Sequence, residues 1–189
     1  IKSLIKCWDR LLKNKEQIPR SLRDFDFFCF HSPFTKQVRK AFLALLFHEL
    51  KQNRDFSKDF NFSKEQSRQL LEKISKNKSF YDRETQKTLK AAFKEELDRR
   101  LEDSLILPAL VGNIYTGSLY LSLISIVYAN SNRLDSLRGK RVMLYSYGSG
   151  LTSSLLHLQF SPSQSLDSLI DARRINEELK RVNILPCST

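Results

Sequence analysis

A short segment near the start of the chain combines an imidazole with two ammonium groups. His31 comes directly before a Ser-Pro pair, and Lys36 and Lys40 follow it. A neutral imidazole can donate a hydrogen bond to an oxygen that gains negative charge, or act as an acid or base. Lysines four residues apart share one helix face, and a helix N-terminus adds positive potential. This set would suit a substrate carrying phosphate, although structural histidines and solvated basic faces are more common.

Two later segments place a polar side chain beside glycine. Asn113 follows Gly112, and its carboxamide could fix a carbonyl or thioester oxygen; equally, Asn113 or Thr116 could cap the helix that follows. Ser149 lies between two glycines, which let the backbone approach a ligand closely. Tyr147 occupies the first glycine position of a GxSxG nucleophile elbow, so the default interpretation of this segment is a hairpin turn.

Helical and strand patterns alternate around these residues and predict an α/β layered architecture. Helical spacing of apolar residues is found over 1–15, 35–50, 65–75, 82–101, 116–130 and 165–182, and strand patterns over 22–30, 141–147 and 151–160. His31 follows the first of these strands. The ends of strands are where α/β proteins assemble their sites. We therefore expect the fold to position His31 at a site edge.

Composition narrows the class of protein without selecting a function. The 189 residues are 41% hydrophobic and 28% charged, which is typical of a soluble globular chain that forms one domain or half of a larger one. A net charge of +11 favours an anionic partner, either nucleic acid, membrane phosphate or a phosphorylated small molecule. Cys7, Cys29 and Cys187 form no CxxC pair, so we expect reduced thiols and no metal site.

Taken together and in order, several motifs resemble the 3-hydroxy-3-methylglutaryl-CoA synthases of eukaryotic type. The segments that carry the resemblance are Asp24-Phe25-Asp26-Phe27, Phe30-His31-Ser32-Pro33-Phe34-Thr35-Lys36, Tyr81-Asp82-Arg83, Gly112-Asn113-Ile114-Tyr115-Thr116, Gly139-Lys140-Arg141 and Ser146-Tyr147-Gly148-Ser149-Gly150-Leu151. The resemblance extends from the first residue to about residue 180. It implies the C-terminal half of a thiolase-like fold, with layered helices on a mixed sheet, over residues 1–189.

The resemblance also implies an activity and a role for each candidate residue. The family condenses acetyl-CoA with acetoacetyl-CoA and water, giving 3-hydroxy-3-methylglutaryl-CoA and CoA. His31 would orient and polarise the acetoacetyl group, and Lys36 and Lys40 would hold CoA. Asn113 would bind the acyl oxygen, and Ser149 would contact the acyl portion. Coenzyme A thioesters would serve as substrates with no further cofactor and no metal, in a homodimer of the cytoplasm or the mitochondrion.

The family's nucleophilic cysteine and basic glutamate belong to an N-terminal half that this chain does not match. None of the three cysteines lies in a corresponding motif, Phe34-Thr35 and Gly117-Ser118 depart from the usual residues, and 181–189 does not follow the pattern. We therefore expect no synthase activity from this chain alone. We also expect an exposed apolar surface where the other half would pack.

Three other functions are compatible with parts of the sequence. A polyketide β-branching synthase of the same superfamily would act on thioesters of a carrier protein, and an inactive paralogue would bind acyl-CoA without turnover. A basic nucleic-acid-binding module would need a continuous basic stripe with exposed aromatic residues. Most aromatic residues here fall in elements expected to be buried, so neither nucleic acid nor a membrane is the expected partner.

Overall fold

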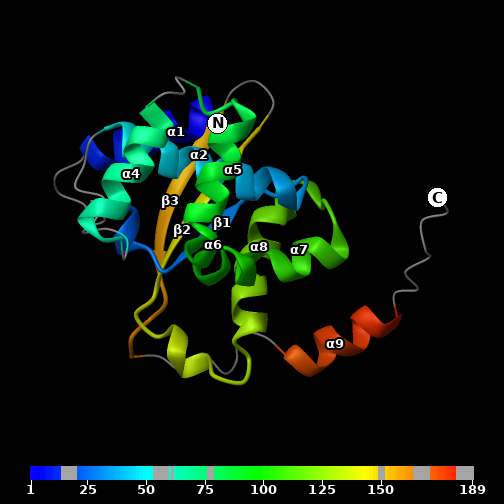
Figure 1. The fold of residues 1–189 in the computed structure, drawn as a ribbon. Coiled ribbons are helices and arrows are strands. Elements are labelled where there is room, and N and C mark those ends of the chain that lie inside the picture. Colours follow the sequence, from blue (N-terminus) through cyan, green and yellow to red (C-terminus); the bar gives the residue numbers. More distant parts are fainter. Residues whose placement is uncertain are drawn as a thin grey trace.

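The computed structural model of the chain describes residues 1–13, 21–52, 60, 62–75, 79–148, 152–163 and 171–181. Within these ranges, a sheet lies between helices (Figure 1). The strands are β1 (Phe27–Phe30), β2 (Arg141–Tyr147) and β3 (Ser153–Gln159); the α-helices are α1 (Lys2–Lys13), α2 (Thr35–Lys51), α4 (Lys64–Ser75), α5 (Arg83–Ala92), α6 (Lys94–Arg100), α7 (Ile106–Val111), α8 (Ser118–Ala129) and α9 (Ala172–Arg181). None of the helices in these ranges combines the length and the hydropathy of a bilayer-spanning segment.

The described strands form a mixed three-stranded sheet in the order β1-β2-β3. β1 runs parallel to β2, with Phe30 opposite Tyr145. β3 runs antiparallel to β2, with Leu155 opposite Tyr145. This agrees with the mixed sheet and layered helices that the sequence predicts. Because β1 and β2 are parallel, their carboxyl ends meet at one edge of the sheet.

The apolar core divides into two clusters on opposite faces of the sheet. The larger cluster packs α1, α2, α4, α5 and α6 against one face, through sheet residues Phe28, Phe30, Met143 and Tyr145. The smaller cluster packs α8 against the other face, through Cys29, Val142 and Leu144. The alternation of side chains along each strand accounts for this division. The sheet is therefore the middle layer of the described structure.

Most of the predicted elements are confirmed, and two differ. The predicted strand over 22–30 is wrong at its start: Leu22–Asp24 is a 3₁₀ turn held by a reciprocal capping box between Ser21 and Asp24. The predicted helix over 82–101 is two helices, α5 and α6, separated at Phe93. The buried Phe93 ring packs against the rings of Phe60 and Phe62, with centroids 5.4 and 5.2 Å away.

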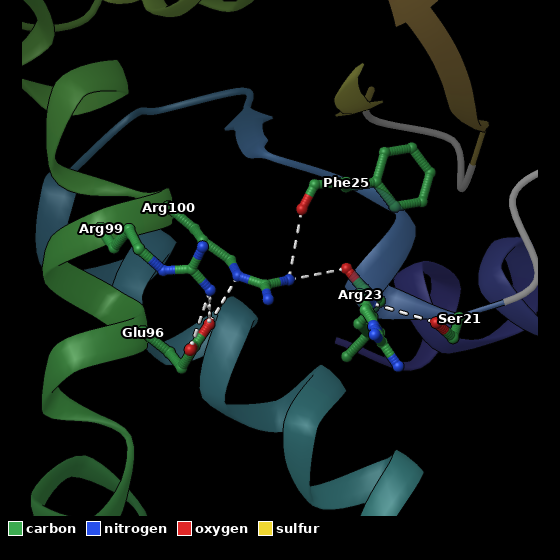
Figure 2. Close-up of polar contacts among 7 residues, drawn as sticks. Ser21, Arg23, Phe25, Glu96, Arg99 and Arg100 are labelled. Carbon is green, nitrogen blue, oxygen red and sulfur yellow. Dashed lines mark hydrogen bonds and ion pairs between the residues drawn. The ribbon is translucent and has the colours of Figure 1, made fainter. Parts of the chain in front are cut away.

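A buried arginine ties α6 to the segment that leads into β1. The Arg100 guanidinium is 4% exposed and donates hydrogen bonds to the carbonyl oxygens of Leu22 and Phe25, at 2.8 and 3.2 Å. Figure 2 shows the Glu96 carboxylate between Arg99 and Arg100, with which it forms ion pairs. Burial lowers the pKa of Arg100, while the charge of Glu96 opposes that shift. Arg100 thus adds a side-chain donor to two carbonyl groups of the turn before β1.

Large apolar side chains are exposed on the helices that cover the second sheet face and on β3. We call this set the open apolar face; it consists of Ile106, Leu110, Val111, Ile114, Tyr120, Ile124, Leu156 and Leu158. Its members lie on α7, on α8, on the segment between them and on the β3 edge. Helix α9 covers part of it, leaving a hollow of about 610 Å³ lined by Val111, Ile124 and Ile175 among others. Exposed apolar side chains on neighbouring helices are typical of a surface that binds another segment.

Removing the Arg100 side chain should destabilise the fold far more than removing its neighbour. In Arg100→Met, Glu96 loses its buried partner, the Phe25 carbonyl loses its side-chain donor and the Leu22 carbonyl keeps the Phe25 N–H at 3.3 Å, so the free energy of unfolding should fall by about 3 kcal/mol. Arg99 is largely exposed, and Arg99→Met should cost less than about 1 kcal/mol. Urea unfolding of both variants with equal m-values measures this. Equal losses would contradict a structural role for Arg100.

A histidine in β3 should make the fold less stable in mild acid. His157 Nε2 is buried without a hydrogen-bond partner, and its ring meets Phe25 edge-on at 5.4 Å. Burial and the charge of Arg141 lower the pKa of His157, with Asp24 acting in the opposite direction. The unfolded chain therefore binds more protons as pH falls below about 6.5, so stability should decline from there through the folded-state pKa.

The variant His157→Gln cannot titrate and should flatten that decline. Its free energy of unfolding relative to the parent chain should rise between about pH 7.5 and about pH 5. Burial also lowers the pKa of His31, which is present in both proteins, so the difference isolates His157. Parallel stability curves for the two proteins would show that His157 is not protonated on unfolding.

Candidate functional site

His31 lies directly after β1, at the edge where β1 and β2 both end. Its backbone N–H donates to the carbonyl oxygen of Tyr145 at 2.8 Å, which extends the strand pairing by one residue. The imidazole meets the Tyr147 ring edge-on, with centroids 5.4 Å apart. Burial lowers the pKa of His31. The ring is therefore neutral at neutral pH and has one N–H to donate.

His31 and Lys40 line the same cleft, which has a volume of about 320 Å³. Its walls come from the start of α1, the first turns of α2 and the ends of β1 and β2, through Ser3, Gln37, Ala41, Tyr145 and Tyr147 among others. Lys40 is exposed and forms no ion pair within the described residues. The cleft thus combines a neutral donor with an uncompensated positive charge.

Lys36 shares the helix face of Lys40 but points to a different neighbour. Its ammonium group lies 5.6 Å from the centroid of the half-exposed Phe34 ring, as a cation–π contact. Lys36 is not among the residues that line the cleft. The structure therefore places Lys40 at the cleft and Lys36 one turn earlier on the outer surface of α2.

Asn113 lies outside the cleft and caps the turn before α8. Its side-chain oxygen accepts hydrogen bonds from the Tyr115 N–H at 2.9 Å and the Ser118 hydroxyl at 3.0 Å. Gly112 precedes it at φ 84°, a conformation that favours glycine. This is the capping interpretation of the motif. The side-chain NH₂ group of the exposed Asn113 makes no hydrogen bond in the described structure, so it can still donate to a ligand.

A short chain of hydrogen bonds connects Asn113 to the end of β1. The Ser118 hydroxyl bonds to Asn113, and the Ser118 carbonyl oxygen accepts a hydrogen bond from the Ser122 hydroxyl at 3.1 Å. The Ser122 hydroxyl also lies 3.4 Å from the Phe30 carbonyl oxygen. Phe30 immediately precedes His31. Asn113 and His31 thus belong to neighbouring layers at one edge of the sheet, with Asn113 on the α8 side and the cleft on the α1–α2 side.

Ser149 lies outside the described residues. The described residue that precedes it, Gly148, is near the cleft, because it directly follows Tyr147, which contacts His31. The Gly148 N–H donates to the Thr152 carbonyl oxygen at 2.9 Å.

The sequence analysis assigned no role to Tyr145, a cleft-wall side chain that contacts its neighbours through both its hydroxyl and its ring. Its hydroxyl and the Ser3 hydroxyl are 2.7 Å apart, and its ring lies against the Tyr147 ring with centroids 6.1 Å apart. Burial raises the pKa of Tyr145, so the hydroxyl remains protonated. Strand alternation could have found it, since residues 143, 145 and 147 share one face.

The described cysteines are not placed as nucleophiles of this cleft. Cys29 is fully buried in the smaller core cluster, and burial strongly raises the pKa of its thiol. The Cys7 thiol lies 3.3 Å from the Ser153 hydroxyl, on the far side of Ser3 along α1. Cys187 lies outside the described residues. Across the described part of the chain, no His, Cys, Asp and Glu side chains group as metal ligands would.

Comparison with known proteins places these features in a family. The family model for the C-terminal part of hydroxymethylglutaryl-coenzyme A synthase matches residues 1–186. A synthase of Schizosaccharomyces pombe is 36% identical over 142 residues, covering 75% of this chain and 30% of its own length. One of Zymoseptoria tritici is 33% identical over 158 residues, covering 80% of this chain and 33% of its own length.

Solved structures agree with these sequence matches. A structure of HMG-CoA synthase complexed with CoA aligns with a TM-score of 0.52 at 27% identity, over 94% of this chain and 36% of that one. MvaS in complex with 3-hydroxy-3-methylglutaryl coenzyme A aligns with a TM-score of 0.59 at 21% identity, over 96% and 40%, which supports the thiolase-like fold. The chain spans about a third of the length of the curated relatives. It belongs to the hydroxymethylglutaryl-CoA synthase family, whose C-terminal region it matches.

Proposed function

We propose that this chain supplies the histidine and the CoA-binding face of an enzyme that condenses acetyl-CoA with acetoacetyl-CoA and water to 3-hydroxy-3-methylglutaryl-CoA. The observation that carries the proposal is the cleft that His31 and Lys40 share in a chain of this family. A related structure of HMG-CoA synthase was solved with CoA. The proposed condensation needs neither a metal nor a second cofactor, because the thioester itself activates the carbon that forms the bond.

The properties of the cleft match the charge changes of that reaction. When a carbanion attacks the ketone of acetoacetyl-CoA, the ketone oxygen becomes negative. A neutral imidazole donates a hydrogen bond to that oxygen, and the partly buried position of His31 strengthens the bond. The free Lys40 ammonium would meet a phosphate of CoA, and Lys36 would add a second positive charge nearby.

The other two candidates have more limited roles in this proposal. The Asn113 carboxamide uses its oxygen within the turn and has its NH₂ group free, so it would donate to an acyl oxygen from the α8 side. Ser149 would contact the acyl portion from the turn that follows Tyr147. Both would act where the ligand crosses the sheet edge from the cleft toward α8.

The open apolar face indicates how the rest of the enzyme would pack. In the proposal, the segment that provides the nucleophilic cysteine and the basic glutamate covers α7, α8 and the β3 edge. Burying these side chains removes a surface that a soluble chain would otherwise have to keep in water. The complete protein would be a homodimer in the cytoplasm, where a human relative that is 33% identical over 154 residues is named as cytoplasmic.

Binding of CoA to the chain should depend on Lys40. Lys40→Gln removes the free ammonium at the cleft and should weaken CoA binding about tenfold at low salt, the equivalent of ~1.4 kcal/mol, with a smaller effect at high salt. Lys51→Gln is the matched control, because Lys51 lies at the other end of α2 with its ammonium 5.4 Å from the Phe47 ring centroid. Isothermal titration with CoA measures both. A Lys51 effect equal to that of Lys40 would contradict the assignment.

Turnover should require the rest of the enzyme and His31. The purified 189-residue chain should release no CoA from acetyl-CoA and acetoacetyl-CoA, whereas the complete protein should be active. In the complete protein, His31→Ala should lower kcat by about 100-fold or more while CoA still binds, since His31 acts on the reacting oxygen. Detectable turnover by the chain alone would disprove the proposal that the nucleophile and the base lie in the rest of the enzyme. Undiminished kcat in His31→Ala would remove the histidine from the mechanism.

Titration with CoA and the turnover assay together separate the two alternative functions. An acyl-CoA-binding paralogue would bind CoA in the same way, yet its complete form would not turn over. A β-branching synthase would prefer an acyl group on a carrier protein to free CoA, and Lys40→Gln would then leave its affinity nearly unchanged.

A further inference from the structure

Helix α1 presents a row of basic side chains that the proposed activity does not use. Lys2, Lys6, Arg10 and Lys13 are all exposed, at spacings of four, four and three residues. At 1.5 Å per residue, the row extends for about 16 Å along one face of the helix. The opposite face, which carries Leu4 and Trp8, is buried in the larger core cluster. The core therefore fixes the row in one outward direction.

The positive charge of this row is not compensated within the described residues. None of its four members forms an ion pair there. Asp9 is the acidic residue of α1, and its carboxylate is already engaged by the His48 ring at 2.8 Å. The sequence shows basic residues spread along the whole chain, and it predicts no membrane partner. Folding gathers four of them into a line, which changes that expectation.

The shape of the row distinguishes between anionic partners. A single-stranded nucleic acid would need aromatic side chains on which its bases could stack, and the Trp8 ring of α1 is 0% exposed. A flat anionic surface meets all four cations at once. No apolar side chain on this face is available for insertion, so the contact would be electrostatic.

We propose that the α1 row is a docking surface for an anionic lipid membrane. The row would lie flat on the headgroups while the core-facing side of α1 remains in the fold. The attraction would weaken with added salt, as expected for exposed charges. Each exposed Lys or Arg near such a surface adds ~1 kcal/mol, about a fivefold gain in partition, so four act together as a reversible anchor.

A second basic row on the same molecule provides a matched control. Arg83, Lys87, Lys90 and Lys94 are exposed along α5 and the start of α6 at spacings of four, three and four residues. Exposed Glu84 and Glu95 lie next to its ends, so its field is partly cancelled. Replacing either row by Gln reduces the formal net charge of the chain from +11 to +7 (11 − 4). The two quadruple variants thus have equal net charge and differ in where the charge was lost.

The experiment is sedimentation of the full chain with vesicles of phosphatidylcholine, with and without phosphatidylserine. The parent chain should bind the vesicles that contain phosphatidylserine and should not bind the vesicles of phosphatidylcholine alone. The α1 variant (Lys2→Gln, Lys6→Gln, Arg10→Gln, Lys13→Gln) should bind them at least about tenfold more weakly, and the α5 variant within about threefold of the parent. Replacing Lys2, Lys6 and Lys13 by Arg should preserve binding, which separates lost charge from a damaged helix.

Three outcomes would overturn the proposal. The parent chain could fail to sediment with the anionic vesicles. The two Gln variants could lose binding equally, which would mean that vesicle binding depends on the net charge of the chain and not on the position of the α1 row. A duplex oligonucleotide could bind the parent chain more tightly than the vesicles do and lose that binding in the α1 variant, which would identify a nucleic acid as the partner.

Discussion

The pairing of β1 with β2 is the constraint on which the rest of the structure depends. β1 has four residues, and His31 continues directly from it. A shift of register by one residue would turn every β1 side chain to the opposite face. It would also move the imidazole away from Tyr147. So short a strand holds its register through contacts at its ends.

Those contacts come from charged groups at the start of β1. The Asp26 carboxylate accepts hydrogen bonds from the Arg141 N–H and the Lys140 ammonium, each at 2.9 Å. The Asp26 N–H in turn donates to the Arg141 carbonyl oxygen at 2.9 Å. Arg100 fixes the preceding turn from the other direction (Figure 2). The polar framework at one end of β1 therefore determines the position of the candidate catalytic group at the other end.

The sequence was a good guide wherever one pattern dominated. The period of α2 and the alternation of β2 gave those elements nearly to the residue, and the order of motifs indicated the thiolase-like fold. It failed where tertiary contacts override the local pattern. Phe93 continues a helical period and its ring packs against two other rings, yet its backbone leaves helical geometry at φ −106° and ψ 24°, where α5 ends and α6 begins. The capping box between Ser21 and Asp24 was not predicted, because these polar residues directly precede an aromatic segment that has a strand pattern.

The candidate site shows a similar limit. Linear spacing placed Lys36 and Lys40 on one helix face, but it could not tell which of them reaches the cleft. The two interpretations of Asn113 proved compatible, because its oxygen caps a turn while its NH₂ group remains available. Tyr145 could not be assigned a role from the sequence, because a tyrosine in a buried strand does not reveal which hydroxyl its own hydroxyl contacts. That partner, Ser3, lies 142 residues away along the chain.

The open apolar face also bears on how such a chain would persist in a cell. Newly made copies with these side chains in water are natural clients for chaperones and targets for proteases until something covers them. In a polypeptide that carries both parts, the covering segment is synthesised first and is present when these side chains emerge. Degradation would then remove those copies in which the two parts fail to pack together.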